Sequence, residues 1–497
     1  MRSRVARIAA RYTGAVEARI LDEFRAIVGA PGLITEREQL STYECDGLTI
    51  FRVLPLAVLL PTSTAEVQGI VRVCHREKIP FVARGSGTGL SGGALPAANG
   101  IVISLTRMNR ILEVDLPNQR VVVEPGVMNL NVTARVAPDG YFYAPDPSSQ
   151  QVCSIGGNVA ENSGGAHCLK YGFTTTHVVG MEVVLPDGSL VHLGGKAVDR
   201  PGYDLSGVFV GSEGTLGIAT KVILRIMKKP EVIQVLLAAF NSTNEAGAAV
   251  SGIIAAGMLP AAIEMMDNLA IQAAEAAVHA NYPDCGGLLL VELDGPAPEV
   301  ETLMEEVADV CTRCGAWEIR VAQSDAERAR VWMGRKAAFA AVGRISPAYI
   351  VQDGVIPRTA LPYVMSEIVR RSAEVGLRVA NVFHAGDGNL HPLVLYDDAV
   401  PGQDKLAETL AGDILRLCIT AGGSITGEHG VGEEKKKFMS EMFAEPDLET
   451  MQLVRCAFDP ENLSNPDKIF PRPRLCGEKP GIYEPHPLEI AGVAQRF

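Results

Sequence analysis

Apolar and polar positions alternate along the chain with the periods of strands and of helices, and the region from 51 to 228 contains both. Short apolar runs bounded by Gly, Pro or Asp predict strands there, and these runs are 56–61, 79–85, 100–105, 120–126, 180–193 and 214–226. The run 180–193 contains a Pro-Asp-Gly turn between its two halves. The segment STAEVQGIVRVCHREK at 63–78 is typical of a helix with Ser63 or Thr64 as its N-cap. This region is therefore predicted to be α+β.

A second α+β region follows the stretch KKPEV at 228–232. Helices with Ala-rich faces are expected between its predicted strands, which are 232–240, 287–295, 318–323, 349–357 and 378–386. Residues 1–50 are predicted to be mostly helical, and loop-rich sequence returns from about residue 420. A length of 497 residues suggests two to four domains, so we expect a domain boundary at 228–232.

Composition and charge narrow the function classes. With 58 acidic and 45 basic residues the net charge is −13, which disfavours nucleic acid or anionic lipid as a partner. No apolar run reaches the eighteen or so residues of a spanning helix. The ten cysteines lack the spacing of a disulfide framework, so we expect free thiols in a reducing compartment such as the cytoplasm. The one C-x-x-C, Cys311 to Cys314, has no second pair nearby, and no cysteine cluster could hold an iron–sulfur centre.

The loop RGSGTGLSGGALP at 84–96 is the first candidate binding element, because it contains a literal G-x-G-x-x-G that begins at Gly87. A Rossmann turn needs a helix that starts inside this motif, and Pro96 prevents such a helix from continuing. Five glycines in nine residues can still turn successive backbone N–H groups towards one anion. A merely tight connection is the alternative, and we favour the phosphate cradle.

Two further segments strengthen this interpretation. Glycines alternate with small polar residues in CSIGGNVAENSGGAHCLKYG at 153–172 and in GSEGTLGI at 211–218. Three glycine-dense segments in one domain suit a long ligand that lies close to the backbone, and a dinucleotide such as FAD fits that description.

The stretch FHAGDGNLH carries two histidines, His384 and His391, around a strong Asp-Gly turn signal at 387–388. A two-residue turn centred there would place His384 directly opposite His391 on one sheet face, with Cβ atoms about 5 Å apart. Such a pair could bind a metal ion. A longer loop would change this register.

A third ligand is available in TGEHGVG, where Glu428 and His429 lie on a Gly-flanked loop. Two imidazoles and one carboxylate leave coordination positions open for a substrate. The alternative is that these histidines are ordinary turn residues. Three of the nine histidines fall in two Gly-rich loops, so we favour a site.

Taken together, the glycine-dense stretches resemble the FAD-binding domain of the vanillyl-alcohol-oxidase-type flavoproteins. With NVFHAGDGNLHP and SITGEHGVGEEK, the chain is similar to the D-2-hydroxyacid dehydrogenase branch of that family over roughly 20–475. The resemblance implies an α+β chain with a two-subdomain FAD-binding fold and an α+β substrate cap domain. The expected parts are an N-terminal helical segment at 1–50, the FAD-binding domain at 51–228, the cap at 229–420, a C-terminal segment that returns to the flavin site at 421–475, and a tail at 476–497.

The resemblance also implies site residues. The expected FAD contacts are Arg84, Gly85, Ser86, Gly87, Thr88, Gly89, Gly92, Gly93, Pro145, Ser154, Gly157, Asn158, Ser163, Gly214, Ile218 and Asn465. Thr88 stands near the place where several relatives carry a histidine that is covalently bonded to FAD, so we expect non-covalent FAD.

In metal-dependent relatives the matching ligands are His384, His391 and Glu428, and His429 is the general base. Zinc is the first candidate, and manganese and iron accept the same ligands. Arg335 matches the family's carboxylate-binding arginine; its alternative is a solvated arginine on a helix face, as we expect for its neighbour Lys336. Phe339 and Leu393 are apolar where relatives that use dicarboxylates are polar, which favours glycolate or D-lactate.

The implied reaction is oxidation of a small 2-hydroxyacid, glycolate to glyoxylate and also D-lactate to pyruvate, with hydride transfer to flavin N5. The implied partners are a second flavin-domain subunit and an iron–sulfur subunit linked to the membrane quinone pool, so we expect a cytoplasmic chain held peripherally at the inner face of the cell membrane. A stand-alone D-lactate dehydrogenase is the close alternative. A zinc hydrolase and a non-catalytic flavin-binding scaffold are the alternatives from other classes.

Overall fold

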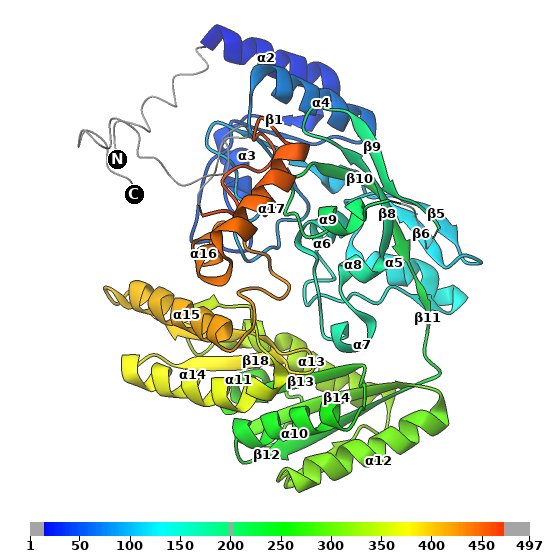
Figure 1. Cartoon of the computed structure of the whole chain (residues 1–497), viewed down its shortest axis with the longest axis vertical. Coiled ribbons are helices and arrows are strands. Elements are labelled where there is room, and N and C mark those ends of the chain that lie inside the picture. Colours follow the sequence, from blue (N-terminus) through cyan, green and yellow to red (C-terminus); the bar gives the residue numbers. More distant parts are fainter. Residues whose placement is uncertain (1–13, 198–201, 472–497) are drawn as a thin grey trace.

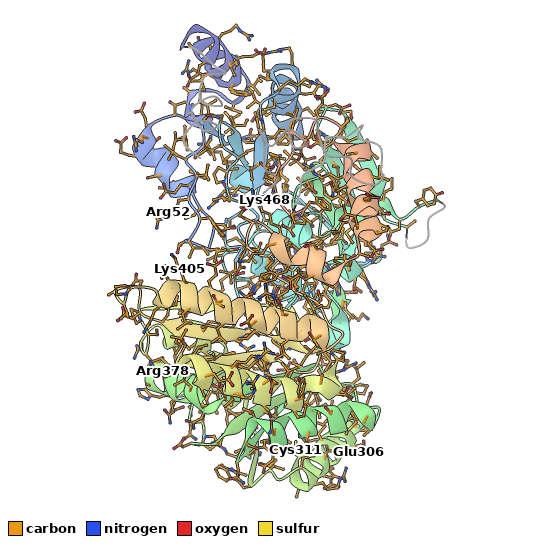
Figure 2. The ribbon with its side chains drawn as sticks, turned by 60° about the vertical axis from the view of Figure 1, so that its left-hand side comes forward. Arg52, Glu306, Cys311, Arg378, Lys405 and Lys468 are labelled. Carbon is orange, nitrogen blue, oxygen red and sulfur yellow. The ribbon has the colours of Figure 1, made fainter. Side chains whose placement is uncertain are left out.

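The computed structural model describes residues 14–197 and 202–471, and the tail expected at 476–497 lies outside this part. The molecule is elongated, with the N-terminal half of the chain above and the segment from β12 (Val232–Phe240) to α15 (Gln403–Thr420) below (Figure 1). The last helices, α16 (Met439–Met442) and α17 (Glu445–Phe458), return to the upper half. Lys468, which follows them, lies in the upper half, while Cys311 lies at the far lower end (Figure 2).

The first subdomain is a four-stranded sheet in the order β1-β2-β4-β3, in which β2, β4 and β3 run parallel. Its strands are β1 (Leu33–Ile34), β2 (Ala57–Leu59), β3 (Phe81–Arg84) and β4 (Ile101–Ser104). The predicted helix is α4 (Thr64–Glu77), and the Ser63 hydroxyl caps it by accepting from the Glu66 N–H. Its apolar face packs with Phe24 of α2 (Gly14–Val28) into one core. The remaining short elements are η1 (Ala30–Gly32), α3 (Arg37–Leu40) and η2 (Ser41–Tyr43).

The second subdomain is a five-stranded antiparallel sheet in the order β5-β6-β10-β8-β9. Its strands are β5 (Ile111–Asp115), β6 (Arg120–Val123), β8 (Val178–Val184), β9 (Leu190–Gly194) and β10 (Ile218–Arg225). The hairpin predicted at 180–193 is β8 and β9, paired with Val184 opposite Leu190. Beside this sheet lie η3 (Leu105–Arg107), α5 (Asn129–Val136), η4 (Ala137–Asp139), α6 (Ile155–Glu161), α7 (Cys168–Tyr171), α8 (Thr174–His177), α9 (Leu205–Phe209) and the β7 (Tyr141–Phe142) and β11 (Met227–Lys228) pair.

The lower half is built on one antiparallel sheet whose main path is β15-β12-β14-β13-β18-β19-β17, with β20 paired to β16 and β18. Along β12, Leu236, Ala238 and Phe240 join one core, while Val235, Leu237 and Ala239 join the core of the opposite face. The other strands are β13 (Ala262–Asp267), β14 (Gly287–Gly295), β15 (Glu318–Val321), β16 (Ala348–Val351), β17 (Gly354–Val355), β18 (Val379–His384), β19 (Asn389–Leu390) and β20 (Pro392–Tyr396).

Helices cover both faces of this sheet. One core is completed by α10 (Thr243–Ala255), α12 (Ala297–Arg313), α14 (Leu361–Val375) and α15. The other is completed by α11 (Asn268–Val278) and α13 (Asp325–Val342). The short η5 (Arg358–Ala360) precedes α14, and η6 (Lys436–Phe438) precedes α16. Strands buried on both faces read as apolar runs, which is why most of them were predictable.

Two sequence expectations need correction. The strands β13 and β20 were not predicted, although both are central to the site described below. Cys456 is disulfide-bonded, so the expectation of free thiols throughout does not hold, while eight other cysteines of the described residues are free. Cys311 is buried on α12, remote from the upper half (Figure 2).

Candidate active site

A cavity of about 390 Å³ lies where the glycine-dense segments of the upper half meet α13 and the loop after α15. From the lower half it is lined by Lys336, Phe339 and Ala340 of α13 and by Glu428 and His429. From the upper half its walls include Arg84, Gly85, Ser86, Gly87, Thr88, Gly89, Gly93, Ser154, Gly157, Asn158, Ser163, Gly214 and Ile218. All three glycine-dense segments found in the sequence therefore face one space.

The glycine loop between β3 and β4 is not a Rossmann turn. No helix lies between Arg84 and Ile101, as Pro96 predicted. A Cβ added at Gly214, where φ is +70°, would meet nothing within 4 Å and would project into open space at the cavity wall. At Gly89 the nearest atom to an added Cβ is an Asp46 carboxylate oxygen at 3.8 Å. Such a wall leaves room for a ligand against the backbone and fits FAD.

The C-terminal segment that contains Asn465 contacts the backbone of this wall. The Asn465 amide donates to the carbonyls of Gly93 at 2.8 Å and Glu213 at 2.6 Å. The Glu213 carboxylate in turn accepts the backbone N–H groups of Val431 and Gly432, both at 2.7 Å. Of the expected FAD contacts, Gly92, Pro145 and Asn465 are not part of the cavity lining.

His384, His391 and Glu428 come together, although not by the predicted hairpin register. His384 pairs with Asn389 across a four-residue loop, and Asn381 pairs with Pro392. The register is thus shifted by two residues from the two-residue turn, and because the side-chain period of a strand is also two, both histidines still share one face. Their rings lie 5.1 Å apart, centre to centre.

The Glu428 carboxylate lies between the two imidazoles. Its Oε1 is 3.3 Å from Nε2 of His384 and 3.3 Å from Nε2 of His391. Bonds of about 2.0–2.1 Å to a tetrahedral zinc ion imply ligand atoms about 3.3–3.4 Å apart. Nε2 of His391 is also 3.5 Å from Oδ1 of Asp353, while Nδ1 has no hydrogen-bond partner among the described residues, although this side chain is 1% exposed. The donor set and the spacing of its ligand atoms both fit a divalent metal ion.

Burial acts to raise the pKa of Glu428, but the hydrogen bonds from His384 and His391 outweigh it and hold the pKa well below its usual range. Burial acts to lower the pKa of His384, and the Glu264 charge outweighs that effect and raises it well above the ordinary value. The site therefore concentrates negative charge around His384, which is what a bound cation requires.

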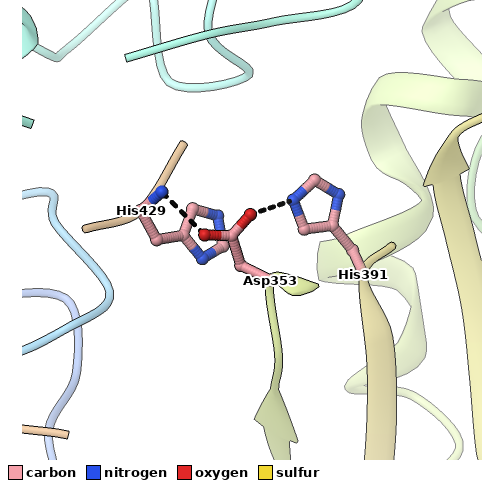
Figure 3. A group of neighbouring side chains, drawn as sticks. All are labelled: Asp353, His391 and His429. Carbon is pink, nitrogen blue, oxygen red and sulfur yellow. Dashed lines mark hydrogen bonds and ion pairs between the residues drawn. The ribbon is translucent and has the colours of Figure 1, made fainter. Parts of the chain in front are cut away.

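Asp353, just after β16, holds the loop that carries Glu428 and His429 (Figure 3). Its Oδ2 accepts from the Thr426 hydroxyl at 2.6 Å, the Gly427 N–H at 3.0 Å and the His429 N–H at 2.9 Å. Lys435 donates to the same oxygen at 3.2 Å, and both side chains are fully buried. Sequence analysis missed this residue.

The His429 ring stacks on that of His391, with centres 5.1 Å apart and planes at 21°. Burial lowers the pKa of His429 to about 4, because the charged imidazole would lose its hydration. A neutral imidazole on the cavity wall can accept a proton at neutral pH.

Arg335 is buried, so the solvated alternative is wrong, but it lies behind the cavity lining. Its Nη2 is 2.5 Å from Oε2 of Glu264, and its guanidinium is 5.9 Å from the centre of the Phe339 ring. Lys336, expected to be only a solvated residue, is exposed and also lines the cavity. Phe339 itself stands 5.7 Å from the His391 ring.

Comparisons with known proteins identify the family of the chain. Residues 55–194 match the family described as FAD binding domain, and residues 229–469 match the one described as FAD linked oxidases, C-terminal domain. The chain is 50% identical over 459 residues to glycolate oxidase subunit GlcD of Escherichia coli K12, covering 92% of each chain. The chain belongs to the family of FAD-linked oxidases.

Other relatives of this FAD-linked oxidase include a second glycolate oxidase subunit and a D-lactate dehydrogenase. The GlcD subunit of Bacillus subtilis is 39% identical over 430 residues, covering 86% of this chain and 92% of that one. A D-lactate dehydrogenase of Anaerostipes hadrus is 32% identical over 462 residues, covering 90% and 97%. The structure of p-cresol methylhydroxylase with substrate bound superposes with a TM-score of 0.77 at 19% identity, covering 91% and 96%. The predicted vanillyl-alcohol-oxidase-type fold and the FAD cofactor are thereby confirmed.

No helix within residues 14–197 and 202–471 is both long and apolar enough to cross a membrane.

Proposed function

We propose that this chain oxidises a small 2-hydroxyacid, with glycolate as the first substrate, by a metal-assisted mechanism. The observation that carries the proposal is the meeting of a backbone-lined FAD cavity with the group formed by His384, His391 and Glu428, beside a neutral His429. The glycolate oxidase subunits named above supply the substrate class.

The proposed roles follow from the geometry. His384, His391 and Glu428 hold a divalent ion, and the three ligand atoms lie within 4.8 Å of one another. FAD bound along the cavity wall would supply the acceptor for the substrate Cα hydride, and a metal ion held by these three residues would supply a Lewis acid for the hydroxyl and carboxylate. His429 takes the hydroxyl proton, for which its neutral form is required. Arg335 offers a guanidinium to the substrate carboxylate from beside Phe339.

Substrate size is proposed from the cavity wall. Phe339 lines the cavity, whereas Leu393 on β20 is fully buried and is not part of the lining. The apolar side chain of Phe339 gives no partner to a second carboxylate, so a dicarboxylate would leave a charge unpaired beside it. D-lactate is the second candidate, because a D-lactate dehydrogenase is 32% identical.

The electrons are proposed to leave through partner subunits. The glycolate oxidase relatives are named as subunits, and no cysteine cluster of the iron–sulfur type occurs in the sequence. A second flavin-domain subunit and an iron–sulfur subunit would carry the electrons to the quinone pool at the inner face of the cell membrane, with this chain on the cytoplasmic side. Isolated chain should then reduce artificial dyes slowly, and addition of the two partners should accelerate the reaction.

The test of the proposed function is a visible spectrum of the purified protein before and after anaerobic addition of glycolate or D-lactate. Flavin bands that bleach faster with glycolate are expected. Chelation should slow the bleaching and leave the FAD bound, and added Mn²⁺ or Zn²⁺ should restore it. A colourless protein, or flavin bands that neither acid bleaches, would contradict the proposal.

A further inference from the structure

Glu264 of β13 contacts both a proposed metal ligand and the proposed substrate-binding arginine. Its Oε1 and Oε2 lie 2.8 and 3.0 Å from Nδ1 of His384. Its Oε2 also lies 2.5 Å from Nη2 of Arg335. The carboxylate is 1% exposed, and its two partners are 5% and 3% exposed. Solvent therefore does not screen the charge of the Glu264 carboxylate.

The backbone explains how one side chain reaches both groups. Glu264 pairs directly with His384 across β13 and β18. Strand alternation places Met266 in the core under α11 and α13, and Met265 in the opposite core. Glu264, two residues before Met266, thus shares the face that α13 covers and meets Arg335 there.

For His384, the contact decides which ring nitrogen is free. When Nδ1–H donates to Glu264, the lone pair on Nε2 points at the side where Glu428 lies, 3.3 Å away. A carboxylate behind a metal-binding imidazole fixes both its tautomer and its ring orientation.

For Arg335, Glu264 is a buried counter-charge that leaves other donors available. Its Nη2 contacts Glu264, while its buried Nε has no hydrogen-bond acceptor among the described residues. A guanidinium held at one edge keeps its remaining N–H groups for an incoming carboxylate.

We propose that Glu264 is a shared positioning residue that sets both the imidazole of His384 and the guanidinium of Arg335. Metal affinity and the affinity for the substrate carboxylate then depend on the same side chain. This inference rests on the proposed function and adds a link between its two binding groups.

The test compares Glu264→Gln with the wild type as FAD-loaded protein. Equilibrium dialysis with Mn²⁺ should show binding weaker by about 10–100-fold in the variant. The KM for glycolate should rise in the variant. At saturating Mn²⁺ and glycolate, kcat should stay close to the wild-type value, because high concentrations of both compensate for weaker binding. The FAD absorbance per chain should not change.

Glu264→Asp is the second variant, in case the uncharged glutamine beside buried Arg335 prevents folding. It keeps the charge but is one methylene shorter, so it cannot hold both partners, and a smaller shift in both affinities is expected. The matched control is Asp267→Asn. Asp267 is a half-buried carboxylate on the same strand that accepts from the Asn381 side-chain amide at 2.7 Å and from the Ala270 N–H at 2.9 Å.

The outcomes separate this inference from the proposed function. If the wild type binds Mn²⁺ and both Glu264 variants bind it equally well, the inference is overturned and the proposed function stands. If Asp267→Asn weakens Mn²⁺ binding as much, a general loosening of β13 is responsible and the inference is also overturned. If the wild type binds neither Mn²⁺ nor Zn²⁺, the metal site and the inference both fall.

Discussion

Asp353 lies beneath His429 and accepts the hydrogen bond from its backbone N–H, with 2.9 Å between Oδ2 and N (Figure 3). The proposed base is thus held from the lower half through its main chain, and its ring remains free to stack on His391. The same oxygen receives the Lys435 ammonium. The Asp353 carboxylate therefore both holds the loop that carries His429 and neutralises the buried charge of Lys435.

Asp353→Asn should lower the free energy of unfolding by about 3–5 kcal/mol, because it leaves the Lys435 charge buried without a counter-charge. Urea denaturation monitored by tryptophan fluorescence measures this change. The double variant Asp353→Asn with Lys435→Met should regain part of the loss, since the unpaired charge is then gone. Equal destabilisation of the single and double variants would contradict the explanation.

His429→Gln should slow flavin reduction by glycolate by about 10²–10⁴-fold, the usual contribution of a general base. FAD content should not change, because this residue only borders the cavity. Stopped-flow absorbance gives the rate. His192→Gln, at a side chain that is 70% exposed, is the control and should reduce flavin at the wild-type rate. A His429 variant with that same rate would favour the non-catalytic scaffold.

Gly214→Val should abolish or strongly weaken FAD binding, because its side chain would enter the cavity. Gly257→Val is a matched control: Gly257 has φ +80° against +70° at Gly214, and an added Cβ there also meets nothing within 4 Å. Both variants carry the strain of a left-handed backbone, about 1–2 kcal/mol, but Gly257 is not part of the cavity. The ratio of flavin to protein absorbance measures the difference, and equal FAD loss in both would argue against the assigned FAD position.

His167 joins the two halves of the molecule and makes their contact dependent on pH. Its Nδ1 lies 2.8 Å from Asp146 and its Nε2 lies 2.9 Å from Glu292. Burial acts to lower the pKa of His167, but the Asp146 charge and the hydrogen bonds to both carboxylates raise it well above the ordinary value.

Because the folded state holds this proton to a higher pH than the unfolded chain, His167 stabilises the fold fully below about pH 6.5 and loses the effect as pH rises through the raised value. The stability difference between wild type and His167→Gln should therefore shrink as the pH rises from about 6.5 upward. Urea denaturation across that range measures it. Glu292→Gln should flatten the same dependence, and a difference that is constant with pH would refute this role.

Local chemistry made part of the site predictable. The proline after the glycine loop excluded a Rossmann helix, and the structure has none there. For the hairpin of His384 and His391, the sequence spacing correctly predicted that both side chains share one face of the sheet. It did not predict the strand register. The Gly388 carbonyl accepts from the Ile356 N–H at 3.0 Å, and an added Cβ at Gly388 would lie 2.1 Å from the Ile356 carbonyl. A contact from a distant segment thus shapes this loop.

The residues that were missed act through partners far away in the sequence. Glu264 is a single carboxylate in the apolar run AIEMMD, and His384 is 120 residues further on. Lys435 belongs to a run of charged residues that would ordinarily be solvated, yet it is fully buried, whereas Lys437 in the same run is 55% exposed. No local pattern distinguishes these side chains from solvated ones.

The hydrogen bonds from Asn465 to Gly93 and Glu213 have a consequence for biosynthesis, because the first of them joins positions 372 residues apart. At about 5–20 residues per second, a ribosome needs about 20–75 s to pass from one to the other. During that time the glycine loop has already been synthesised, but the Asn465 amide that hydrogen-bonds to it has not. FAD binding is therefore expected to follow translation. A nascent chain stalled before residue 465 should lack flavin absorbance.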